Sequence, residues 1–475
     1  MGNRSALFGF ITFLSISGAV ASAATPVLDY TNATAYMKAL QQSNDPEAKT
    51  ILKQIEDGPA DLQREQALTQ QAGIPLVAPK MEISADTNAA PLYDQWKALR
   101  KQRDVALPNY AQTLSYRYQY TPEQIARVQK IFDENHDIFD LLHQAAGKPA
   151  LVLSDDSFTA YATMRETSRE IKTEAYLQAR NGKYEYAIAT EALGFQAAKQ
   201  VTSHPAYINY LVGMAMETIT LSGMKDILYF AGPNEDIDNH IGAAIHSARP
   251  VMSLKESLTG EVAEELKSLN ILRTASPDAV AANVSLDQNT GGKPPKSPPF
   301  TPAEREFIIK ILDASQARFL AGARAIIASA DLPATQRRAR FAQLAGAYKA
   351  KTEEQNSHPN PVDAMSVAIL AVLAESDKSD DRRSADEEVT MAAAAILASK
   401  AHTGQFPAAL PDGFTDPFTG KPLGYRTEGD NGFVVYSAGP DGNFDGGKAG
   451  ATPPKQAVLF RYPAAAPIPV PKNML

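Results

Sequence analysis

The chain has 475 residues, which is enough for two or three domains. Hydrophobic residues make up 44% and charged residues 21% of the sequence, so disorder throughout is excluded. The formal net charge of -8 argues against nucleic acid as a partner, because phosphates are bound by clustered Lys and Arg. The absence of cysteine excludes thiol nucleophiles, cysteine-ligated metals, disulfides and a lipid-modified N-terminal cysteine.

Residues 1–23 have the pattern of a cleavable secretory signal peptide. Arg4 supplies a positive charge, an apolar run extends from Ala6 to Val20, and Ala21-Ser22-Ala23 is a pattern after which signal peptidase cleaves. The apolar run is shorter than the roughly 20 residues that a membrane-spanning helix needs. We therefore expect a mature chain that begins at Ala24, is periplasmic or secreted and has no stable membrane span. An uncleaved anchor is the alternative.

Residues 24–275 are predicted to form a helical domain, since no sustained two-residue alternation is present. The strongest signal is the capping box of Thr121 and Gln124 with Pro122 at the first helical position. It begins a helix that we expect to end at Gly147. Its buried face is predicted to contain five apolar residues: Ile125, Val128, Phe132, Phe139 and Leu142.

Antiparallel helix pairs are predicted next, at residues 157–179, 184–202 and 206–230. Asn181-Gly182 supplies a tight turn between the first two helices. An Ala-rich helix, a Gly turn and a second helix make residues 174–198 similar to one tetratricopeptide unit, although no regular repeat surrounds them. The expected fold is therefore mainly α, an irregular antiparallel helical array that is tetratricopeptide-like in part.

The second half of the chain is predicted to begin with a Pro/Gly-rich linker or loop at residues 276–302. A second capping box, Thr301 with Glu304, then begins a helical continuation over residues 303–376. A charged stretch precedes an Ala-rich helix that ends near Lys400. After it, glycines separate short segments, of which Phe433–Tyr436 is the best strand. Residues 464–475 are Ala/Pro-rich and are expected to be a disordered tail.

Two segments near the C-terminus share a pattern with a known family. Asp416-Pro417-Phe418 begins a turn that leads to Tyr425-Arg426, and Tyr436-Ser437-Ala438-Gly439-Pro440-Asp441-Gly442 ends a second strand. Together with the preceding helix, residues 386–450 resemble the globular domain of the major pseudopilin of type II secretion. The resemblance implies a small α+β module. It does not imply a pilus subunit, because the N-terminal prepilin motif is absent: no acidic residue precedes Asp29. As a whole, the chain resembles a group of large exported bacterial proteins with a helical body, which implies no particular activity.

The sequence of the loop after this second strand predicts a calcium site. Asp441, Asn443 and Asp445 place side-chain oxygens at alternate positions before Gly446, as in the first half of a Ca²⁺ loop. The pseudopilin resemblance also implies Ca²⁺ here. The twelfth position is Thr452 and not the bidentate Glu of an EF-hand, so backbone carbonyls, for example of Ser437 or Gly439, would have to complete the site. A plain Asp/Asn/Gly turn is the alternative.

Other polar groupings favour structural roles. His136, Asp140 and His143 share a helix face and could ligate a metal, but polar residues are also expected at the edge of a buried face. His240 and His246 follow three acidic residues that suit a helix N-terminus. Ser222 and Lys225 have β-lactamase-like spacing without its companion motifs. Four tyrosines precede the capping box at Thr121, namely Tyr110, Tyr116, Tyr118 and Tyr120. They could stack on a ligand, but tyrosines in such a connection more often cover a helix junction.

Three functions are compatible with these patterns. The first is an exported non-catalytic helical protein that engages a protein partner or has a structural role in the envelope. The second is a periplasmic or secreted hydrolase with a His/carboxylate site in the helical body. The third is an accessory component of a type II secretion-like system. Because no catalytic motif is recognisable, the sequence favours the first and assigns no catalytic residue.

Overall fold

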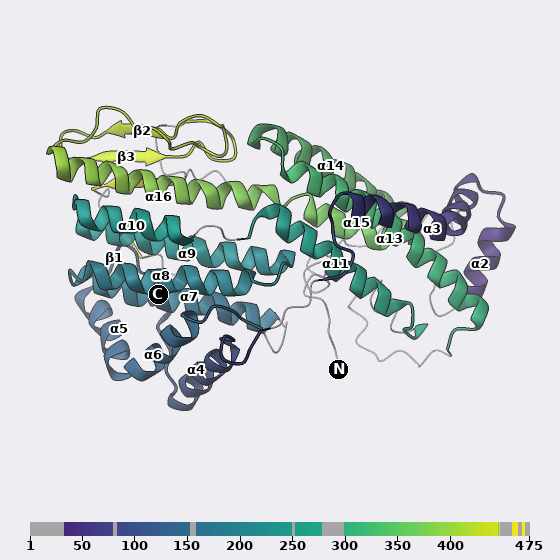
Figure 1. The fold of residues 1–475 in the computed structure, drawn as a ribbon, viewed down its shortest axis with the longest axis horizontal. Helices are drawn as coiled ribbons and strands as arrows, with labels where there is room; N and C mark the ends of the chain where they lie inside the picture. Colours follow the sequence, from purple (N-terminus) through teal and green to yellow (C-terminus); the bar gives the residue numbers. More distant parts are fainter. Residues whose placement is uncertain are drawn as a thin grey trace. The chain divides into compact units, whose positions relative to one another are not determined.

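The computed structural model of the protein describes residues 33–78, 83–152, 158–248, 252–277, 299–444, 446, 458–463 and 468–470. This part of the chain contains fourteen α-helices and a small antiparallel sheet of three strands near the C-terminus. Figure 1 shows how the helices are arranged and where β2 and β3 of the sheet lie. The expectation of a mainly α chain with a small C-terminal sheet is therefore confirmed. The signal-peptide residues 1–23 lie outside the described residues.

The chain divides into two compact units that interleave along the sequence. The first contains residues up to 80, 205–208 and 254–377, and the second contains 81–204, 209–253 and 378–475. The expected single domain at 24–275 is therefore divided between both units, because segments far apart in the sequence share a core. In the first unit, for example, Ile55 and Leu269 lie in one apolar cluster with Ile308.

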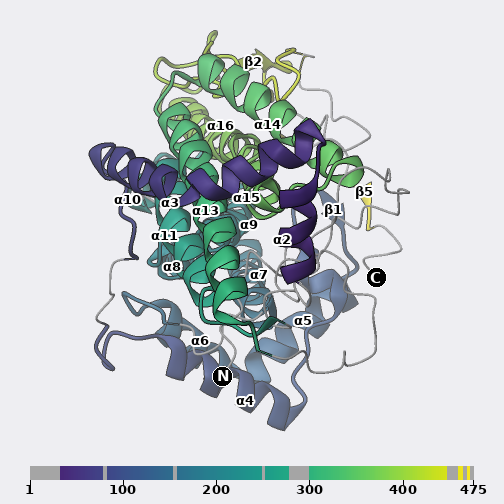
Figure 2. The ribbon, with the colours of Figure 1, turned by 90° about the vertical axis from the view of Figure 1, so that its right-hand side faces the viewer.

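The first unit is built around its longest helix, α13 (Pro302–Ala330). This helix packs against α3, α11, α14 and α15, and Figure 2 shows α3 crossing it. Gly58 permits the close approach of α3, because a Cβ there would lie 2.7 Å from the carbonyl oxygen of Lys310. The remaining helices of the unit are α2 (Ala33–Gln42), α3 (Pro46–Gln71), α11 (Leu254–Leu272), α14 (Ala334–Ser357) and α15 (Pro361–Leu373).

The second unit contains the expected antiparallel pairs. Helices α7 (Phe158–Arg180) and α8 (Tyr184–Thr202) pack together across the Asn181-Gly182 turn, where Gly182 has a φ of 74°. Helices α9 (Tyr207–Ala231) and α10 (Glu235–Ala248) follow, and Figure 1 shows α7 to α10 lying side by side. The unit also contains α4 (Ala90–Arg103) and the 3₁₀ helix η2 (Asn109–Thr113).

Two predicted helix boundaries are wrong. The helix expected from Thr121 to Gly147 is two helices, α5 (Pro122–Glu134) and α6 (His136–Ala146). They separate at Asn135, whose φ of -130° is outside the helical range. The charged stretch before the Ala-rich helix is itself helical, because α16 extends over Asp377–Thr403. Its charges have partners within the fold, which composition alone does not reveal.

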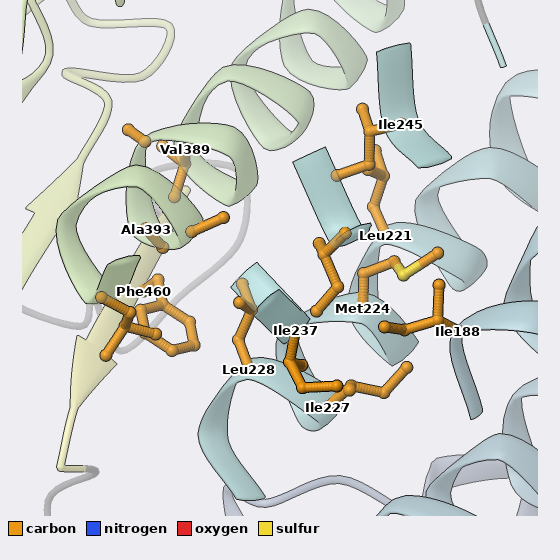
Figure 3. Close-up of a cluster of buried hydrophobic side chains, with 14 of the residues drawn as sticks. Ile188, Leu221, Met224, Ile227, Leu228, Ile237, Ile245, Val389, Ala393 and Phe460 are labelled. Atoms are coloured by element: carbon orange, nitrogen blue, oxygen red, sulfur yellow. The ribbon is translucent and has the colours of Figure 1, made fainter. Parts of the chain in front are cut away.

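The C-terminal sheet has the order β2 (Gly424–Thr427), β3 (Phe433–Tyr436) and β4 (Leu459–Tyr462), and both pairings are antiparallel. All four residues of β3 are buried, as expected for the central strand of a covered sheet. Figure 3 shows the core of the unit, where side chains of α8, α9, α10 and α16 meet Phe460 of β4. The predicted strand at Phe433–Tyr436 is thus present.

The end of the chain contains a short strand that the sequence did not suggest. Strand β5 (Ile468–Pro469) pairs in parallel with β1 (Tyr118–Gln119), and Val470 after it is buried. The predicted disorder over 464–475 is therefore wrong at these residues, because backbone pairing with a segment far away in the sequence orders them. The predicted linker at 276–302 lies mostly outside the described residues, and its last residues lead into α13 at Thr301.

Candidate functional site

The predicted calcium loop is only partly described. Asp441 and Asn443 are exposed, and the backbone N–H of Asn443 donates to Asp441 Oδ1 at 3.1 Å, which forms an Asx turn. Asp445 lies outside the described residues. Ser437 is buried, and its Oγ accepts from the backbone N–H of Gly439 at 3.0 Å. If Ser437 binds an ion, its carbonyl oxygen would therefore be the ligand, as predicted from the sequence.

Asp416, the first residue of the Asp-Pro-aromatic turn, organises the start of this loop. Its carboxylate is fully buried and accepts from Ser437 Oγ at 2.7 Å and from Thr419 Oγ1 at 2.9 Å. Backbone N–H groups of Phe418 and Ala438 donate to it as well, both at 3.2 Å. Four donors satisfy a buried carboxylate, so Asp416 fixes the turn after α16 to the end of β3. The Asp-Pro-aromatic pattern was the sequence signal for this role.

The histidines pair separately with single carboxylates. His143 Nε2 lies 2.7 Å from Glu174 Oε2 of α7, and His240 Nδ1 lies 2.9 Å from Glu185 Oε1 of α8. Burial alone would lower the pKa of His143, but the hydrogen bond and charge of Glu174 outweigh it and raise that pKa. In the described parts of the chain, no three His, Asp or Glu side chains are grouped as metal ligands.

Lys225 pairs with a carboxylate of another helix and not with Ser222. Its Nζ donates to Asp386 Oδ1 of α16, and both side chains are almost completely buried. Three of the four tyrosines that could have stacked on a ligand are likewise buried, namely Tyr110, Tyr116 and Tyr120. Tyr116 stacks on Tyr229 with ring centroids 4.6 Å apart, as expected for a residue that covers a helix junction.

A second buried ionic network joins α7 and α9 to the segment that precedes β1. Lys172 Nζ is 3.3 Å from Asp226 Oδ2 and also donates to the carbonyl oxygen of Leu114. Asp226 Oδ1 accepts from Ser115 Oγ and from the backbone N–H of Tyr116, each at 2.9 Å. Burial raises the pKa of Asp226, and the charge of Lys172 opposes this shift. Each of these residues is less than one tenth exposed, so a substrate cannot reach the network. The network therefore has a structural role.

A cavity of about 240 Å³ lies in the second unit at the C-terminal end of α4. Trp96, Lys97, Arg100 and Lys101 of α4 line it, together with Glu166 of α7. This cavity was not predicted from the sequence. The available signal was the spacing of one tryptophan and several cations on a single helix face, where residues three and four apart are neighbours.

No protein-family model matches the chain, and no curated protein or solved structure is significantly similar to it. The pseudopilin and tetratricopeptide resemblances therefore rest on sequence pattern alone and stay predictions. Among the described helices, none combines the length and hydropathy required to cross a membrane.

Proposed function

We propose that the chain is an exported, non-catalytic helical protein that engages a protein partner through its C-terminal module. The observation that carries the proposal is the arrangement of this module, in which α16 is followed by a three-stranded antiparallel sheet with β2 at one edge. Arg426 and Thr427 of β2 are exposed. An exposed edge strand offers unpaired backbone groups to which a partner can add a strand.

The geometry of the helical body favours binding over hydrolysis. A His/carboxylate hydrolase requires histidines that converge with acids on one pocket. His143 and His240 instead have separate partners, Glu174 and Glu185. Neither histidine lines the cavity at α4.

Site-specific photocrosslinking in cells tests the partner role. A photoreactive residue at Thr427 of β2 should give one discrete crosslinked product, whereas the same residue at Lys130, exposed on α5, should give none. A secretin or pilus subunit in that product would support the secretion-system accessory role instead of a separate envelope role. Equal labelling at both positions, or no product at Thr427, would contradict partner binding through β2.

Export is tested on the same strain by fractionation and N-terminal mass analysis. A cleaved signal peptide gives a chain beginning at Ala24 in the periplasm or medium. A full-length precursor confined to the cytoplasm would rule out export, even if crosslinking succeeded.

We also propose that the loop at residues 437–446 binds Ca²⁺ and that the bound ion stabilises the module. The carboxylates of Asp441 and Asp445, the amide of Asn443 and the carbonyl oxygens of Ser437 and Gly439 are hard oxygen donors, which suit this ion. An ion that binds only the folded state raises the melting temperature. Ca²⁺ should therefore raise the melting temperature of the wild type but not of Asp441→Ala or Asp445→Ala.

Asp430→Ala is the matched control, because Asp430 is an exposed acid in the β2–β3 turn of the same module. It should keep the full response to Ca²⁺ and to chelator. If chelator leaves the wild type unchanged, the loop is a plain turn.

A further inference from the structure

The buried pair of Lys225 and Asp386 joins two helices of the second unit. Lys225 Nζ of α9 donates directly to Asp386 Oδ1 of α16, and the two side chains are 5% and 12% exposed. Leu221 and Leu228 on α9 and Val389 on α16 each lie one helical turn from the pair. All three belong to one buried apolar cluster, which Figure 3 shows. The amine and the carboxyl group therefore touch each other at the edge of an apolar core.

The other buried pair of this unit, Lys172 with Asp226, shows what keeps such a pair ionic. A hydroxyl group and a backbone N–H also donate to the carboxylate of Asp226, and the ammonium of Lys172 also donates to a backbone carbonyl oxygen. Hydrogen bonds to the charged forms stabilise both charges. Within the described part of the chain, Lys225 is the single donor to the side chain of Asp386, and its Nζ has no second acceptor. The ionic form of this pair thus lacks the additional bonds.

Burial favours the uncharged form of the Lys225–Asp386 pair. It lowers the pKa of Lys225, and the charge of Arg117 lowers that pKa further, against the opposing effects of Asp386 and Asp226. An uncharged amine is a nucleophile, whereas an ammonium group is not. One proton that passes from Nζ to Oδ1 along the existing hydrogen bond leaves an amine beside a carboxylic acid. This transfer removes two charges from a site of low dielectric constant.

We propose that Lys225 and Asp386 condense in the folded chain to form an intramolecular amide bond. Nζ attacks Cγ of the carboxylic acid, the bond between Nζ and Cγ forms, and the bond between Cγ and the protonated oxygen breaks. Nζ gives one proton to the departing hydroxyl group, so one water molecule leaves and no co-reactant is consumed. Arg117, whose charge acts on Asp386, stabilises the negative charge that develops on the remaining oxygen. The apolar surroundings keep water from hydrolysing the product.

The amide bond closes a long loop in a chain that contains no cysteine and therefore no disulfide. Lys225 and Asp386 are 161 residues apart in the sequence. The closed loop contains five complete helices, which are α10, α11, α13, α14 and α15. A crosslink across a long loop lowers the conformational entropy of the unfolded chain, as in the loop-closure account of disulfides. The bond thus stabilises the fold by the same means as a disulfide.

The intact mass of the denatured full chain tests the bond directly. The wild type should be lighter than its linear sequence, counted from the measured N-terminus, by one water molecule. Lys225→Gln and Asp386→Ala should each have the mass of their linear sequences. Trypsin does not cleave after an acylated lysine, so it should release residues 200–255 joined to residues 384–400. Fragmentation of this branched peptide distinguishes the amide bond from a succinimide at an Asp-Gly step, which also loses water.

The Lys172–Asp226 pair is the internal control, because trypsin should cleave after Lys172 as after any free lysine. A chain translated and kept in urea should have the linear mass and should lose water only after refolding. The inference is overturned by a wild type of linear mass after refolding, by a water loss located elsewhere, by a branched peptide at Lys172 in place of Lys225, or by a loss that occurs in urea. Partner binding at β2 and export affect none of these masses beyond the measured N-terminus, so the inference fails or holds independently of both.

Discussion

At the residue scale, the least expected feature is Glu191 on α8. It is fully buried, and neither of its carboxylate oxygens has a hydrogen-bond partner. Burial raises its pKa well above the usual range, and the neutral form is therefore favoured. The side chain is accommodated because α9 has Gly223 opposite it, where a Cβ would overlap Glu191 Oε1.

Gly223→Ala should therefore destabilise the chain by about 1–3 kcal/mol, as overpacking does in cores. Gly242→Ala on α10 is the control, since a Cβ there meets nothing within 4 Å. A helical Ala in free space should stabilise by about 0.5–1 kcal/mol. Urea unfolding measures both, and equal effects of the two changes would refute the contact between Glu191 and Gly223.

Asp226 is the second residue with a strong expected effect. Asp226→Ala leaves the Lys172 ammonium buried without its counter-charge and removes the acceptor of Ser115 Oγ. Breaking one partner of a buried pair costs about 3–5 kcal/mol. The double variant Lys172→Met with Asp226→Leu should recover most of this loss in urea unfolding. A double variant as unstable as the single one would show that the hydrogen bonds, and not the charge, dominate.

At the element scale, the two capping boxes show how local signals acquire tertiary roles. Both predicted boxes are formed, at Thr121 with Gln124 and at Thr301 with Glu304. Glu304 Oε1 also accepts from Thr34 Oγ1 at 2.6 Å and from the Thr34 backbone N–H at 3.2 Å. The start of α13 thereby holds the start of α2, which no local pattern indicates.

Replacement of the third helical residue (N3) of each box tests this added role. Gln124→Ala removes a local cap alone, whereas Glu304→Ala also removes both bonds to Thr34. Glu304→Ala should therefore cost about 1 kcal/mol more. Hydrogen exchange should show faster exchange in α2 for Glu304→Ala only. Unchanged exchange in α2 would mean that the bonds to Thr34 contribute little.

At the scale of the whole molecule, buried acids determine the expected pH dependence. Burial raises the pKa of Glu170 and of Glu265 to about 8 and that of Glu217 and Asp238 to about 7. In the unfolded chain these groups have pKa values near 4. The folded chain therefore binds more protons between pH 4 and pH 8, and stability falls as the pH rises through 7 to 8. Lys225, whose pKa burial lowers, acts in the opposite sense.

The free energy of unfolding should thus be higher at pH 5 than at pH 8 by at least about 1.4 kcal/mol, the equivalent of one pKa unit in one group. Urea unfolding at both pH values measures the difference. Glu170→Gln and Glu265→Gln should each flatten the dependence. A chain that is more stable at pH 8 would show that the carboxylates are ionised in the fold.

The sequence by itself determined those features that depend on residues close together along the chain. Hydrophobic periodicity, capping residues and turn glycines located α7, α8, α13 and β3, because helix and strand signals are local. It also located Asp441 and Asn443 in a turn, although ion binding there remains a prediction. The break at Asn135 was missed because the apolar spacing continues across it from Phe132 to Phe139. The helical start of α16 was missed because capping and periodicity signals do not report distant partners of its charges.

Tertiary structure decided which distant segments share a core and which polar groups meet. The interleaved units, the pairing of β5 with β1 and the Lys172–Asp226 network all join residues far apart in the sequence. The cavity at Trp96 likewise requires α4 and α7 together, so only half of its charge pattern is readable from one helix. Burial decides the charge state of an acid, and burial is a property of the folded chain and not of its sequence pattern.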